Sequence, residues 1–97
     1  MHDTFIYFMN AYFYQDWQSE YSGTRVDDTN VLIRFVQNEN LEIVTNLVTD
    51  IKYILSNDLA KQIFDTNNFD FNPLLYGYSS EREWFEVVYK KLISEIK

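Results

Sequence analysis

The sequence contains no cysteine among its 97 residues. The chain can therefore form no disulfide and offers no thiolate as a nucleophile or metal ligand, which is typical of proteins that work in a reducing compartment. Glycine, with two residues, and proline, with one, are also scarce. Because sandwiches and barrels of β-strands need many tight turns built on these residues, their scarcity favours helices.

The sequence also lacks targeting and catalytic patterns. No signal sequence opens it, and no apolar run approaches the roughly 20 residues that a transmembrane helix needs. We therefore expect the mature protein to start at Met1 and to stay in the cytoplasm. Its single histidine, His2, lies at a terminus, and no phosphate-binding loop, two-histidine metal motif or EF-hand occurs. The sequence thus predicts no enzyme, no metal site and no cofactor.

The charge is strongly acidic, with 15 Asp and Glu against eight Lys and Arg and a formal net charge of -7. Phosphate backbones and anionic membrane surfaces repel such a protein, so we expect neither direct nucleic-acid binding nor membrane binding. The same charge favours a basic protein partner, although it also serves solubility. Pairs such as Asp27 and Asp28 are interpreted as helix caps and surface residues rather than as cation ligands.

What the sequence has in abundance is apolar area. Hydrophobic residues make up 46% and aromatic residues 19%, with eight Phe, eight Tyr and two Trp. Disordered chains are poor in such residues, and a chain of this length has room for one core. Large aromatic side chains also compensate for the high surface-to-volume ratio of a small protein. We therefore expect one domain over residues 1–97.

Apolar residues recur with helical spacing in five segments. The first has Phe5, Phe8, Met9 and Tyr12 on one face, with Asp3 or Thr4 as its cap. Tyr7 and Tyr14 share the opposite face, which is either exposed or covered by a second layer of helices; we favour the covered position. The other segments are 31–36, capped by Thr24, Asp27 or Asp28; 41–55, capped within 38–40; 59–64, capped by Asn57 or Asp58; and 80–96.

Residues 69–78 separate the last two segments and combine aromatic residues with Pro73 and Gly77. This mixture predicts an ordered loop held by its own side chains. Ser80 and Glu83 then match a capping box, in which each residue's side chain accepts a hydrogen bond from the backbone amide of the other. The sequence predicts an all-α, compact single-domain bundle of about five helices with an ordered aromatic loop before the last helix.

The stretch Ala11-Tyr12-Phe13-Tyr14-Gln15-Asp16-Trp17, followed by Glu20-Tyr21, resembles the Ala-Tyr-Phe-His-Gln-Asp-Trp signature of a family of bacterial immunity proteins. Those proteins belong to contact-dependent growth inhibition systems. The family's later pattern of a short helix, a longer aliphatic helix and a last helix opened by Ser-x-x-Glu-Trp has counterparts at 31–36, 41–55 and 80–84. Tyr14 stands where the family commonly has His, so a role of that imidazole does not carry over.

The resemblance implies that the chain binds and neutralises the C-terminal toxin domain of a contact-dependent inhibitor protein. Such toxins are frequently nucleases, and a basic toxin suits an acidic inhibitor. We interpret one set of residues as structural rather than as toxin contacts: Tyr12, Phe13, Gln15, Asp16, Trp17 and Trp84.

The toxin-binding surface is predicted at the loop before the last helix and at the acidic start of that helix. Loops on a rigid scaffold often carry recognition, and tyrosine gives a large contact area at low entropic cost. The candidates are Asp65, Asp70, Tyr76, Tyr78 and Glu81. For the two tyrosines, the alternative is that they hold the loop against the core.

Two other functions remain open at this stage. An acidic mimic of nucleic acid would block a protein that binds DNA or RNA, but it would need dense acids along one face, whereas acids here occur in every segment. A structural or regulatory subunit would instead dock into an assembly through exposed aromatic residues. The gene immediately upstream distinguishes these functions, because a large secreted protein that ends in a toxin domain supports immunity.

Overall fold

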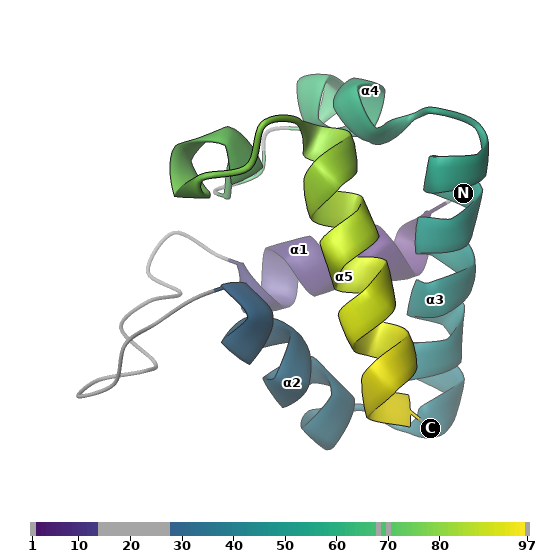
Figure 1. Ribbon diagram of the computed structural model, residues 1–97. Helices are drawn as coiled ribbons and strands as arrows, with labels where there is room; N and C mark the ends of the chain where they lie inside the picture. The colour runs from purple at the N-terminus through teal and green to yellow at the C-terminus, as the bar shows by residue number, and fades with distance from the viewer. Residues whose placement is uncertain (1, 14–27, 68, 70, 97) are drawn as a thin grey trace.

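The fold is described by a computed structural model that covers residues 2–13, 28–67, 69 and 71–96 (Figure 1). Within these ranges the elements are α1 (Asp3–Tyr12), α2 (Asp28–Asn38), α3 (Leu41–Ser56), α4 (Ala60–Thr66), the 3₁₀ helix η2 (Pro73–Tyr76) and α5 (Glu81–Ile96). The described residues contain five α-helices and no strand. The predicted all-α bundle is therefore confirmed, while the short helix η2 was not foreseen.

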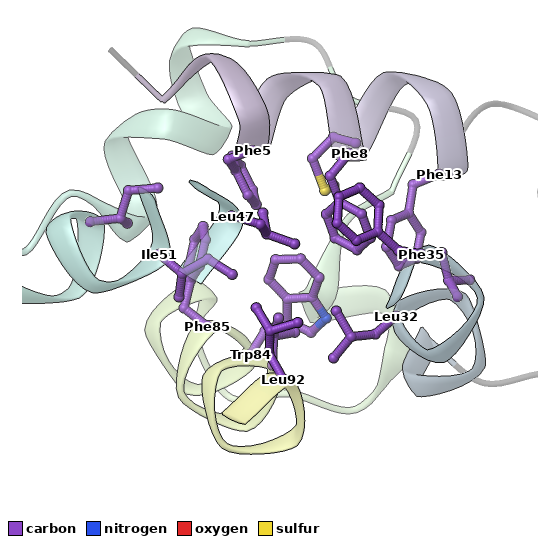
Figure 2. Close-up of a cluster of buried hydrophobic side chains, with 14 of the residues drawn as sticks. Phe5, Phe8, Phe13, Leu32, Phe35, Leu47, Ile51, Trp84, Phe85 and Leu92 are labelled. Atoms are coloured by element: carbon purple, nitrogen blue, oxygen red, sulfur yellow. The ribbon is translucent and has the colours of Figure 1, made fainter. Parts of the chain in front are cut away.

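Helix α5 is the central packing element of the bundle. It runs between α2 and α3 and contacts both of them, together with α4 and η2 (Figure 1). Helix α1 crosses the opposite side of the core and contacts α2 and α3. Side chains from α1 and α5 therefore meet in the middle, with α2 and α3 closing the sides (Figure 2).

Aromatic side chains fill this core. Phe5 and Phe8 on α1 and Trp84 and Phe85 on α5 have no exposed surface (Figure 2). The Trp84 ring lies with its centroid 5.2–6.3 Å from the rings of Phe5, Phe13, Phe64, Phe71 and Phe85. Most of these pairs are tilted or edge-to-face, which is the arrangement that the ring quadrupole favours. Trp84 thus joins α1, α4, the loop and α5 in one cluster.

A helix cap follows the sequence prediction only where the capping residue directly precedes its own helix. The Asn40 side chain accepts a hydrogen bond from the Ile43 amide at 2.9 Å and caps α3 as predicted. The predicted caps of α1 and α4 are wrong. Asp3 and Thr4 lie inside the first turn of α1, and Leu59, which makes no side-chain cap bond, occupies the cap position of α4 in place of Asn57 or Asp58.

The amino end of α1 is capped by a residue from another helix. The Asp50 carboxylate on α3 accepts a hydrogen bond from the Phe5 amide at 3.0 Å, across 45 residues of sequence. The negative charge also lies near the positive end of the α1 dipole. Asp50 therefore satisfies one of the free amides of the first turn and ties α1 to α3.

We expect Asp50→Ala to lower the free energy of unfolding by about 1 kcal/mol, because the substitution leaves the Phe5 amide without its acceptor. Urea unfolding followed by circular dichroism measures the change. Asp50→Asn is the control, since it keeps an oxygen acceptor and should retain most of the stability. An Asp50→Ala protein as stable as the wild type would show that this cap contributes nothing.

Leu41 and Tyr7 depart from the predicted burial. Leu41, placed on the core face of its helix by periodicity, is 72% exposed, because it is the first residue of α3 and extends past the neighbouring helices. Tyr7 is 46% exposed, so none of the described helices covers this side of α1 fully, and the preferred interpretation of the Tyr7 face is wrong. The Tyr7 hydroxyl instead donates to the Glu39 carboxylate at 2.8 Å. Tyr14 lies outside the described residues.

Candidate functional site

The loop before α5 is ordered by two of its own residues, as predicted. Phe71 and Pro73 are buried, and the Phe71 ring packs 4.5 Å from Phe13 and 5.2 Å from Trp84, measured between centroids. The Asn72 side chain accepts a hydrogen bond from the Leu74 amide at 3.0 Å and caps η2. Gly77 ends η2 at φ 94°, a left-handed conformation that strains any residue with a Cβ atom. Residues 71–77 are therefore anchored to the core.

The start of α5 forms the predicted capping box with one difference. The Ser80 hydroxyl accepts a hydrogen bond from the Glu83 amide at 3.1 Å, as predicted. The Glu83 carboxylate, however, bonds to Ser79 rather than to the Ser80 amide, accepting from the Ser79 amide at 3.0 Å and from its hydroxyl at 3.1 Å. Ser79 offers two donors to the carboxylate, which explains the shift. These bonds fix the acidic first turn of α5.

The structure brings Asp65 and Glu81 together. Asp65 lies on α4 rather than in the loop, and Glu81 is the first residue of α5. Both line an open groove of about 590 Å³ between α4 and α5, together with Lys61 and Arg82. Both also line a second hollow of about 210 Å³ that extends to Asn72 at the start of η2. We call the shared region of Asp65 and Glu81 the acidic groove.

Lys61 lies beside both acids of this groove. Its ammonium is 2.6 Å from the Asp65 carboxylate, in an exposed pair one helical turn apart. The hydrogen bond and the charge of Asp65, with a smaller contribution from the charge of Glu81, raise the pKa of Lys61 above its ordinary value. Lys61 thus interacts with two carboxylates. With Asp58 and Arg82 also on the lining, three acidic and two basic side chains face the groove, which leaves a formal charge of -1. Because the pair is exposed, it contributes little to stability.

Arg82 holds the walls of the groove in place. Its guanidinium donates to the Leu55 carbonyl at 3.0 Å, at the carboxyl end of α3. It also lies 3.5 Å from the Asp58 carboxylate and 3.8 Å from that of Glu86. The side chain therefore connects α3, the turn before α4 and α5. A fixed geometry of this kind reduces the ordering cost when a partner binds.

The remaining predicted contact residues divide between the core and the surface. The Tyr76 ring stacks on Phe71 with centroids 5.0 Å apart, yet 41% of the residue is exposed. Tyr78 is half-buried and packs against the core. Tyr76 therefore holds the loop against the core and also exposes part of its surface. Tyr78 fits the alternative interpretation, in which it holds the loop against the core. Asp70 lies outside the described residues.

Two exposed apolar residues beside this site were not predicted from the sequence. Leu74 on η2 is 47% exposed and Leu75 is 78% exposed. One signal could have found them: two consecutive leucines between Pro73 and Gly77 occupy too tight a turn for both to reach one core. Lys61 and Arg82 were missed as well, since nothing in the sequence places them between the acids.

The signature residues that the structure describes lie in or against the core. Phe13 and Trp84 are buried. The half-buried Tyr12 packs on Phe35 and donates to the Glu39 carboxylate at 2.6 Å. Its burial and this hydrogen bond raise the pKa of the Tyr12 hydroxyl above its ordinary value. The other members of the signature, Gln15, Asp16 and Trp17, lie outside the described residues.

The described residues contain neither a candidate metal site nor a candidate membrane span. No group of three or more His, Asp or Glu side chains in these ranges is arranged to hold a metal ion. No helix among the described residues has the length and apolar character needed to cross a membrane. The described surface therefore offers the acidic groove and the neighbouring 3₁₀ helix as its most distinctive features.

Comparison with known protein families gives a match over most of the chain. The sequence profile of a family described as CdiI immunity protein matches residues 3–92. This range begins at the first residue of α1 and ends within the last turns of α5. No curated protein and no solved structure matches the chain.

Proposed function

The chain belongs to the CdiI immunity protein family of contact-dependent growth inhibition systems, and from this membership we propose that it binds and neutralises the C-terminal toxin domain of an inhibitor protein. The match over residues 3–92 is the observation that carries the proposal. It also confirms the resemblance seen in residues 11–17. Proteins of this kind act by binding, so we propose no catalysis by the chain itself, with residues 1–97 as a single binding domain.

The charge supports a particular class of toxin. A nuclease needs Lys and Arg side chains to hold the phosphates of its substrate. An inhibitor with a net charge of -7 and an acidic groove complements such a surface and repels nucleic acid itself. We therefore propose that the cognate toxin is a basic nuclease, and that the chain meets it in the cytoplasm, where its substrate lies.

The acidic groove is the proposed contact surface. Asp65 and Glu81 supply the charge that attracts basic side chains, and Tyr76 adds an exposed aromatic face on η2. Asp70 and Tyr78 complete the proposed set of contact residues from the sequence. The rigid walls formed by Arg82 and the capped start of α5 present these groups in a fixed arrangement.

We expect the purified chain to bind the toxin domain encoded by the adjoining upstream gene with a Kd of about 10 nM or tighter, as stable inhibitory complexes do. Expression of the chain should also restore growth of cells that produce this toxin domain. Isothermal titration calorimetry and growth curves measure the two effects.

A toxin domain from an unrelated contact-dependent system is the control, because specificity in such pairs depends on surface residues private to each pair. The chain should neither bind it nor protect against it. Cells that die equally with and without the chain, together with no measurable binding, would contradict the proposed function.

A further inference from the structure

The short helix η2 carries an uncharged, apolar surface at the edge of the bundle. Its residues Pro73–Tyr76 include Leu74 and Leu75, which are 47% and 78% exposed. We call these two residues the leucine ridge. Figure 1 shows η2 beyond the amino end of α5, away from the end of the bundle where α3 begins. Apolar surface favours binding in proportion to the area that a partner removes from water, and Leu75 has most of its surface still to bury.

The backbone beneath the leucine ridge is held from three sides. Pro73 is buried, the Asn72 side chain caps the first turn, and Gly77 closes the helix with a left-handed conformation. The Tyr76 ring stacks on buried Phe71. A surface that is already ordered loses little conformational entropy on binding, so its apolar area converts efficiently into affinity.

The leucine ridge is adjacent to the acidic groove. The hollow lined by Asp65 and Glu81 extends to Asn72, the residue that caps η2. Asn72 therefore connects the two features, because it lines the hollow with the two acids and caps the helix that carries the two leucines. An apolar centre bordered by polar and charged groups is the usual anatomy of a protein interface.

The two candidate occupants of this surface are a second copy of the chain and a toxin domain, and charge distinguishes between them. A second copy of the chain would bring another net charge of -7 and another acidic groove against the first, which is unfavourable. A basic toxin domain complements the acidic end. The occupant that fits is therefore a toxin domain with an apolar depression bordered by Lys or Arg side chains.

Resting on the proposed function, we propose that the leucine ridge is the apolar anchor of the toxin complex, with Leu75 inserted in this depression while Asp65 and Glu81 pair with its basic border. The anchor sets the lifetime of the complex, since apolar contacts at the centre of an interface act mainly on dissociation. The acidic groove sets the rate of encounter.

The test compares Leu75→Ser with Leu41→Ser. Leu41 is also an exposed leucine, at 72%, but it lies at the opposite end of the bundle, at the start of α3 (Figure 1). Both variants should melt within about 4 °C of the wild type, because each side chain is exposed. With the upstream-encoded toxin domain, Leu75→Ser should raise Kd about tenfold or more through faster dissociation, and Leu41→Ser should leave Kd unchanged.

The outcomes separate this inference from the proposed function. If the wild type does not bind the toxin domain, the proposed function fails and the anchor with it. If the wild type binds and Leu75→Ser binds equally well, the anchor alone is wrong. Light scattering after size exclusion provides a second measurement: a wild-type dimer that Leu75→Ser converts to a monomer would assign the leucine ridge to self-association and overturn the inference.

Discussion

Replacement of Trp84 by alanine is expected to lower the free energy of unfolding by about 3–5 kcal/mol, the cost of deleting a large buried aromatic side chain. Trp84 has no exposed surface, and its ring contacts the aromatic residues of α1, α4, the loop and α5. No single neighbour can collapse into the resulting space, because each is held by its own element. For a protein of 97 residues this loss is a large part of the total stability.

Urea unfolding followed by far-ultraviolet circular dichroism measures the effect of Trp84→Ala. Tyr53→Ala is the control, because Tyr53 is also aromatic but is exposed and contacts the ring of His2 at the surface. We expect it to cost less than about 1 kcal/mol. A Trp84→Ala protein that unfolds like the wild type but no longer binds the toxin domain would assign Trp84 to the interface instead of the core.

The parts of the fold that could be predicted are those that depend on neighbouring residues. Asn40 caps α3 and Ser80 caps α5, and each accepts a hydrogen bond from an amide a few residues further along the chain. The sequence alone shows that the two partners of each bond are neighbours. The cap of α1 could not be predicted in this way. Its acceptor, Asp50, becomes a neighbour only after α1 packs on α3.

Periodicity predicted the core face of each helix but not how far along the helix the core extends. Leu41 and Ile96 fit their apolar faces and are nevertheless exposed, at the first residue of α3 and the last of α5. Helix ends extend past their neighbours, so an apolar residue there has nothing to pack against. The same reasoning applies to Leu75, which lies on a helix too short to bury both of its leucines.

The sequence predicted Asp65 and Glu81 as contact residues but not Lys61, Arg82 or the geometry of the groove. Asp65 and Glu81 were chosen as acids near an aromatic loop, and the structure places both in one groove. Their proximity depends on how α4 packs against α5, and on Arg82, which reaches back 27 residues to the Leu55 carbonyl. Nothing in the spacing of the sequence specifies that contact.

The double reversal Asp65→Lys with Glu81→Lys is expected to slow association with the toxin domain about tenfold at low salt, because it replaces two attractive charges in the acidic groove by two repulsive ones. The dependence of the association rate on ionic strength should weaken in parallel. Stability should fall only slightly, since the Lys61 pair of Asp65 is exposed. Stopped-flow measurements at several salt concentrations give the rates.

Glu42→Lys is the matched control for Glu81→Lys. Both glutamates lie in the first turn of a 16-residue helix, so each reversal carries the same unfavourable interaction with the helix dipole. Glu42, however, lies in the first turn of α3, and Figure 1 shows the start of α3 at the opposite end of the bundle from α4 and the start of α5. If Glu42→Lys slows association as much as Glu81→Lys alone does, the toxin responds only to net charge. Recognition would then not be centred on Asp65 and Glu81, because charges that steer by position must act more strongly near the contact than far from it.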